Sequence, residues 1–141
     1  MNNDIRTLQP AALWQHFYDI TRIPRPSGYK EPIRKFLLDF GQSLGLETET
    51  DAIGNVVVRK PASPGYEDKP GVILQAHMDM VPQKNVDVNF DFERDPIDAH
   101  IAADGQWVEA SGTTLGADDG IGVAAAMAII ADPTLQHPAL E

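Results

Sequence analysis

The stretch GVILQAHMDM, residues 71–80, decides how this sequence is interpreted. It is a short, nearly continuous apolar run, which is the pattern of a strand buried on both faces of a sheet. Within it, His77 and Asp79 stand two positions apart, and side chains two positions apart on a strand point to the same face. The run therefore predicts a core strand that carries an imidazole and a carboxylate side by side at its C-terminal end.

Two helices and a hairpin are predicted before this strand. Residues 10–23 and residues 32–44 each carry apolar side chains at helical spacing. Residues 46–60 predict two strands around a Gly-Asn turn, because the second half of the segment is rich in β-branched side chains. The Pro- and Gly-rich residues 61–70 then predict a surface loop.

The order of elements after the core strand indicates the fold class. Residues 86–105 are acidic and predict a loop or an exposed hairpin, and residues 106–110 predict a short strand. The turn-rich residues 112–122 lead into an Ala-rich helix over residues 123–130, which ends near Asp132. Helices, strands and then a strand–loop–helix unit favour an α/β fold with a mixed β-sheet flanked by helices.

Composition excludes several classes of function. The 141 residues carry a formal net charge of −10, which argues against a nucleic-acid or anionic-membrane surface because phosphate groups are bound by clustered Lys and Arg. There is no cysteine, so a metal would have to be held by His, Asp or Glu. No run approaches a membrane-spanning length and no signal peptide begins the chain, so a cytoplasmic protein is expected.

A second chemical motif is TTLGADDGIG, residues 113–122. Asp118 and Asp119 are adjacent carboxylates, whose mutual repulsion a bound cation would offset. Each motif also has a plain structural interpretation: Asp118 or Asp119 could cap the following helix, and His77 could be a buried histidine satisfied by Asp79. Together the two motifs favour a metal site, and their ligand types suit Zn²⁺, with Co²⁺ or Mn²⁺ as substitutes.

The two motifs resemble those of a known family of enzymes. LQAHMDMVPQKN, residues 74–85, and GTTLGADDGIGVA, residues 112–124, are similar to the co-catalytic zinc metallopeptidases, and most of all to the PepD type, the aminoacyl-histidine dipeptidases. IPRPSG at residues 23–28, GNVVVRKPA at residues 54–62 and DPI at residues 95–97 extend the resemblance. It covers essentially the whole chain.

The resemblance implies a role for each residue of the two motifs. His77 corresponds to a ligand of one zinc ion, and Asp79 to the catalytic-site carboxylate that holds that histidine in place. Asp118 corresponds to the ligand that bridges two zinc ions, while Asp119 need not be a ligand. The family commonly has a cis peptide after the bridging aspartate, so one is expected between Asp118 and Asp119.

The family also implies what lies outside this sequence. Residues 1–141 would form the N-terminal part of the catalytic peptidase domain. The rest of that domain, including a Glu pair that supplies the general base and a ligand, and a lid or dimerisation domain would be absent. The 141-residue chain alone is therefore expected to be inactive.

The implied activity is zinc-dependent hydrolysis of dipeptides with a free N-terminus, including Xaa-His dipeptides, by a full-length homodimer. Two alternatives stay open from the sequence. One is an amide deacylase of the same metal architecture, since substrate choice depends on parts that these residues do not contain. The other is a truncated, non-catalytic relative that serves as a binding module.

Overall fold

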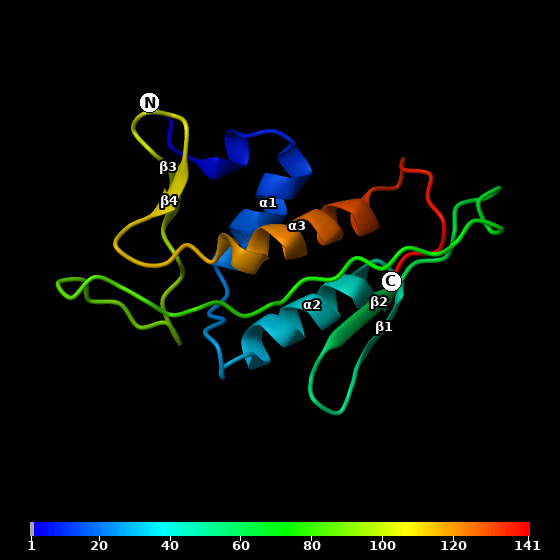
Figure 1. The fold of residues 1–141 in the computed structure, drawn as a ribbon, viewed down its shortest axis with the longest axis horizontal. Helices are drawn as coiled ribbons and strands as arrows, with labels where there is room; N and C mark the ends of the chain where they lie inside the picture. The colour runs from blue at the N-terminus through cyan, green and yellow to red at the C-terminus, as the bar shows by residue number, and fades with distance from the viewer. Residues whose placement is uncertain (1) are drawn as a thin grey trace.

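The computed structural model describes residues 2–141 as helices and short strands in the order shown in Figure 1. A 3₁₀ turn, η1 (Ile5–Thr7), precedes helices α1 (Ala11–Thr21) and α2 (Glu31–Ser43). Strands β1 (Glu47–Thr50) and β2 (Val56–Arg59) follow. Strands β3 (Ala99–Ile101) and β4 (Val108–Ala110) then lead to α3 (Ala117–Ala131). The predicted α/β class is confirmed, and both N-terminal helices lie where their periodicity places them.

The core lies between α1, α2 and α3. Phe17 and Ile20 of α1, Ile33 of α2 and Val123 and Met127 of α3 are buried together. Phe17 and Ile20 are three positions apart and Val123 and Met127 are four apart, so α1 and α3 each turn one apolar stripe inward. The alanines of α3 allow close packing against α1, which crosses it in Figure 1.

Two antiparallel hairpins flank this helical core. Glu47 faces Arg59 and Thr50 faces Val56 in the β1–β2 hairpin, which confirms the strand pair predicted over residues 46–60. Gly54 in its turn has φ +92°, a conformation that favours glycine. The β3–β4 pair confirms the short strand predicted over residues 106–110. The loop or exposed hairpin predicted over residues 86–105 is wrong at its end, because β3 pairs with this later strand and Ala99, Ile101 and Val108 pack against the core.

The prediction of a core strand at residues 71–80 is wrong, because the structure forms no strand there. This segment is extended and passes between α3 and α2 (Figure 1), but the only β-bridges that it forms within residues 2–141 are isolated ones, at Val72 and at Met80. Val72 and Ile73 are 43% and 73% exposed, so the segment is not buried on both faces. An apolar run reports a tendency to be covered, whereas a strand also needs a partner backbone beside it.

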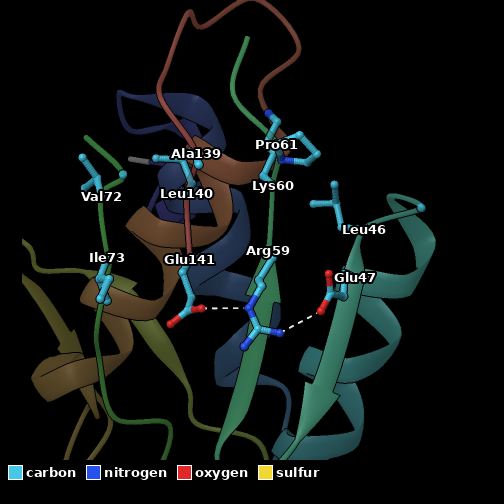
Figure 2. A pocket seen from close by; sticks show the side chains of 12 residues that line it. Leu46, Glu47, Arg59, Lys60, Pro61, Val72, Ile73, Ala139, Leu140 and Glu141 are labelled. Atoms are coloured by element: carbon cyan, nitrogen blue, oxygen red, sulfur yellow. Dashed lines mark hydrogen bonds and ion pairs between the residues drawn. The ribbon is translucent and has the colours of Figure 1, made fainter. Parts of the chain in front are cut away.

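The last three residues pair with extended segments on both sides. The backbone of Leu140 exchanges two hydrogen bonds of 2.9 Å with Lys60, which continues β2, and Glu141 bonds Val72 and Leu74. The first pairing is antiparallel and the second parallel, so the pairing here has the mixed character expected of the fold. Figure 2 shows the adjoining hollow of about 530 Å³, where Arg59 bonds Glu47 and Glu141 at 2.8 Å each.

Candidate metal site

The candidate site is built on the extended segment that carries His77 and Asp79. Ala76 and Met78 pack against the helical core, and Met80 is only 3% exposed. Backbone alternation therefore turns His77 and Asp79 to the opposite side, as strand geometry predicts. The side chain of His77 is half exposed, whereas that of Asp79 is 29% exposed.

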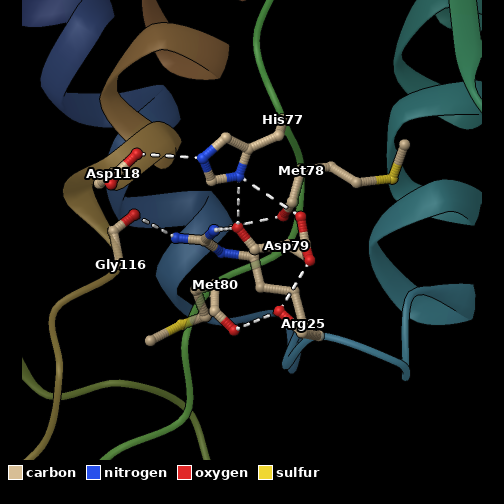
Figure 3. A network of polar contacts seen from close by, with 8 residues as sticks. Arg25, His77, Met78, Asp79, Met80, Gly116 and Asp118 are labelled. Atoms are coloured by element: carbon tan, nitrogen blue, oxygen red, sulfur yellow. Dashed lines mark hydrogen bonds and ion pairs between the residues drawn. The ribbon is translucent and has the colours of Figure 1, made fainter.

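Both ring nitrogens of His77 face acceptors (Figure 3). Nδ1 lies 3.0 Å from the backbone carbonyl oxygen of Asp79 and 3.4 Å from its Oδ1 atom. Nε2 lies 3.0 Å from Oδ1 of Asp118. Because Asp79 holds the Nδ1 side of the ring, Nε2 is the nitrogen that is presented to Asp118 and to any cation bound between them.

The electrostatics of this pair favour positive charge. Partial burial acts to lower the pKa of His77, but the hydrogen bonds to Asp118 and to the Asp79 carbonyl outweigh burial and raise the pKa. A proton on Nε2 would be stabilised by the carboxylate of Asp118. A metal ion, if bound here, would be held by Nε2 of His77 and by the carboxylate of Asp118, which would offset its positive charge.

Asp118 is brought to His77 by the irregular start of α3. Gly116 precedes the helix with φ +76°, and Asp118 and Asp119 have non-helical backbone angles before the regular helix continues. The peptide between Asp118 and Asp119 is cis, as the resemblance implied. The Asp118 side chain is 97% exposed even with its contact to His77, so its second oxygen is open to solvent and to further partners.

Two further side chains hold Asp79 and its backbone in place. Ser27 donates from Oγ to Oδ2 of Asp79 at 2.8 Å, and this bond is the largest cause of a lowered pKa of Asp79. Arg25 is 2% exposed and donates to backbone carbonyls of Met78 and Gly116. No sequence pattern predicts a role for Ser27 or Arg25, although both lie in the IPRPSG segment that carries part of the resemblance.

The geometry of His77 and Asp118 fits a metal ion. Two ligand atoms on one tetrahedral zinc are about 3.3 Å apart, given metal–ligand bonds of about 2.0–2.1 Å. The observed distance between Nε2 and Oδ1 is 3.0 Å. Within residues 2–141, however, no three His, Asp or Glu side chains are grouped so that they could together hold a metal ion. His77 and Asp118 could therefore form at most part of a ligand set.

The other histidines lie in settings unrelated to this site. His16 packs edge-on against Phe40 with ring centroids 5.6 Å apart. His100 faces Glu109 across the β3–β4 hairpin at 3.3 Å. His137 is 8% exposed and bonds through Nδ1 to the carbonyl oxygen of Pro138.

Two hollows in the structure are separate from the candidate metal site. The first surrounds Arg59 (Figure 2), and the second, of about 380 Å³, lies between β2 and residues 73–78 with walls from α2 and α3. Neither is lined by His77, Asp79 or Asp118.

None of the helices that the structure describes combines the length and apolar character needed to cross a membrane.

Comparison with known proteins shows similarity to dipeptidases. The chain is 46% identical over 139 residues to a cytosol non-specific dipeptidase from Escherichia coli, covering 99% of this chain and 28% of that protein. Its structure superposes on that of an aminoacylhistidine dipeptidase from Vibrio alginolyticus with a TM-score of 0.93 and 48% identity, covering 96% of this chain and 27% of the other. The similarity to the PepD type is thereby confirmed.

More distant structures share the fold alone. A tripeptidase from Staphylococcus aureus gives a TM-score of 0.70 at 23% identity, and aminopeptidase PepT from Bacillus cereus gives 0.68 at 22%. Each match covers 92% of this chain and 34% of the other. No protein-family model matches the sequence. The chain thus spans about a quarter to a third of the length of the relatives and structures it matches.

Proposed function

We propose that residues 1–141 are the N-terminal part of the catalytic domain of a zinc-dependent dipeptidase. The observation that carries the proposal is the convergence of His77 Nε2 and Asp118 Oδ1 at 3.0 Å. It occurs in a chain 46% and 48% identical to proteins named as dipeptidases. The proposed substrates are dipeptides with a free N-terminus, including Xaa-His dipeptides.

His77 and Asp118 are the proposed zinc ligands in this part of the protein. His77 would bind one zinc ion through Nε2, the nitrogen that faces Asp118. Asp118 would bridge two zinc ions, because its exposed carboxylate has a second oxygen available. When bound, zinc ions supply Lewis acidity, which polarises the scissile carbonyl and makes a water molecule more acidic.

Asp79 is the proposed orienting carboxylate. Its backbone carbonyl and its Oδ1 atom both face Nδ1 of His77, which holds a proton on Nδ1 and leaves Nε2 for the metal. Ser27 holds the other oxygen of Asp79 at 2.8 Å, so the carboxylate cannot swing freely away from the ring. The reaction depends on this alignment because a ligand that rotates cannot keep the metal in a single geometry.

Among the described residues 2–141, only two donors converge at the site, so the remaining ligands and the general base would come from parts of the protein outside these residues. We propose that the protein acts in the cytoplasm as a homodimer and that it binds neither nucleic acid nor membrane. The net charge of −10 supports the last point, because it disfavours contact with anionic surfaces.

The activity can be tested directly with the full-length protein. It should hydrolyse a Xaa-His dipeptide, lose the activity on chelation and regain it with Zn²⁺, Co²⁺ or Mn²⁺. An N-acylated amino acid serves as the second substrate. Zinc-dependent hydrolysis of that compound in place of the dipeptide would instead identify a deacylase, and a folded, metal-loaded protein inactive on both would contradict the proposal.

A further inference from the structure

The Arg25 side chain connects the segment that carries His77 with the segment that carries Asp118. Arg25 follows α1 in the chain, and its side chain is 2% exposed. Nη1 donates to the carbonyl of Met78 at 3.2 Å and to that of Asp79 at 3.4 Å, while Nη2 donates to the carbonyl of Gly116 at 2.7 Å. One planar guanidinium thus bonds the backbone next to His77 and the backbone two residues before Asp118 (Figure 3).

Burial of this charge calls for a specific explanation. Burial lowers the pKa of Arg25 to about 10, with the nearby charge of Asp79 opposing the shift, so the group stays protonated at neutral pH. Nε of Arg25 has no hydrogen-bond partner within the part of the chain that the structure describes, and the partners of the two terminal nitrogens are backbone carbonyls. A buried charge is weak evidence for stability, because an apolar side chain of similar volume often packs as well. An apolar replacement could not, however, donate hydrogen bonds to the backbone carbonyls of both segments at once.

The turn around Asp118 is shaped to admit the guanidinium. A methyl group added at Gly116 would lie 2.5 Å from Nη2 of Arg25 and 2.8 Å from the sulfur of Met80. One added at Gly120 would lie 2.6 Å from the same nitrogen and 3.1 Å from the ring of Phe17. Two glycines of the GADDG turn therefore leave the space that Arg25 fills, so the turn and the arginine form one packed unit.

The backbone of the same segment reinforces this contact. The carbonyl of Arg25 accepts from the amide of Met80 at 3.0 Å, and the amide of Ser27 donates to the carbonyl of Met80 at 3.0 Å. Residues 25–27 are consequently anchored beside residues 78–80 by main-chain bonds. The guanidinium extends from this anchored backbone to the carbonyl of Gly116, so the distance between the two segments is set by the length of the Arg25 side chain.

We propose that Arg25 is a positioning residue that sets the separation of His77 and Asp118 by bonding backbone carbonyls on both of their segments. It touches neither metal nor substrate and acts through the two ligands. The inference rests on the proposed metal site, because the separation matters only if both side chains bind the metal. A lysine at this position would keep the charge but lose the planar pair of donors.

The test uses the full-length protein and its Arg25→Lys variant, both stripped of metal. Zinc affinity is measured by competition with a chromophoric chelator, and Co²⁺ binding by its visible spectrum. We expect Arg25→Lys to weaken zinc binding by about 10- to 100-fold, the range for residues that orient metal ligands, and to alter the Co²⁺ spectrum. Without metal, hydrogen exchange of the Gly120 amide, which bonds the Gly116 carbonyl at 3.0 Å, should become faster.

Ile33→Val is the matched control for general destabilisation, because Ile33 is fully buried in the core on α2. It should lower the melting temperature without changing zinc affinity or the Co²⁺ spectrum. If Arg25→Lys does not fold, the Gly120→Ala variant is used instead in the same measurements, because its added methyl group would displace the guanidinium. Unchanged zinc affinity and Gly120 exchange in a folded variant would overturn the role of Arg25. Failure of the parent to bind zinc would instead overturn the proposed function.

Discussion

The Nε2 atom of His77 lies 3.0 Å from the Oδ1 atom of Asp118, although the two residues are 41 positions apart in the chain. His77 comes from an extended segment, whereas Asp118 comes from the irregular first turn of α3. Each is the type of ligand that zinc prefers in a site without cysteine. Their convergence is the physical basis for the predictions that depend on metal.

Replacement of either proposed ligand should remove the proposed zinc-dependent activity from the full-length protein. Metal ions contribute several kcal/mol to stabilisation of the transition state, so we expect His77→Ala and Asp118→Ala each to reduce kcat/KM by about 1000-fold or more. Initial rates on a Xaa-His dipeptide measure this. His100→Ala is the control, because His100 faces Glu109 in the β3–β4 hairpin. Near-normal zinc-dependent rates in either ligand variant would remove that residue from the site.

Loss of the bond between Ser27 and Asp79 should have a smaller effect. Ser27→Ala frees one oxygen of Asp79 but leaves the Asp79 carbonyl on His77. We expect zinc affinity to fall by about 10-fold, and Asp79→Ala to cost up to about 100-fold while some binding remains. Chelator competition measures both affinities. Equal affinity in Asp79→Ala and the parent would show that Asp79 does not orient His77.

Gly41→Ala should destabilise the protein, contrary to the usual effect in a helix. Alanine within a helix is normally favoured over glycine by about 1 kcal/mol. Here the added methyl would lie 2.9 Å from Cγ2 of Thr48 and 3.0 Å from Cγ2 of Val58, where α2 meets the β1–β2 hairpin. Overpacking costs typically about 1–3 kcal/mol, so we expect a net loss, measured by urea unfolding.

A second substitution identifies the cause of that loss. Thr48→Ala removes the nearest side-chain atoms, so Gly41→Ala should cost less in the Thr48→Ala background than in the parent. Strictly additive free energies of unfolding would mean that contact with Thr48 is not what destabilises the variant.

His16 should make stability depend on pH. Burial lowers the pKa of His16 below its ordinary value of 6.5, with the charge of Asp19 opposing the shift. The unfolded chain therefore binds a proton more readily than the folded chain, so the contribution of His16 is complete above pH 6.5 and is lost as the pH falls through the lower folded value. Urea unfolding between pH 7.5 and pH 5 should show a smaller loss in His16→Gln than in the parent. An identical loss in both proteins would assign the pH dependence to other groups.

Local patterns predicted the elements that are stabilised within a short stretch of chain. The apolar stripe of α2 and the shared face of His77 and Asp79 follow from periodicities of 3.6 and 2, and β2 follows from the strand preference of its β-branched side chains. The pairing of residues 71–80 could not be predicted in this way, because it depends on which backbone lies alongside. Arg25 and Ser27 were missed for the same reason, since their partners Met78 and Asp79 lie more than 50 positions away.

The sequence by itself determined the chemical types at the site and the resemblance to the dipeptidases. A histidine and aspartates without any cysteine limit which metals can bind, whatever the fold. Only the tertiary structure decided that His77 Nε2 faces Asp118 and that a buried Arg25 bonds both of their segments. Residue type is a local property of the chain, whereas the distance between two ligands depends on how separate segments pack, and here one guanidinium bonds them both.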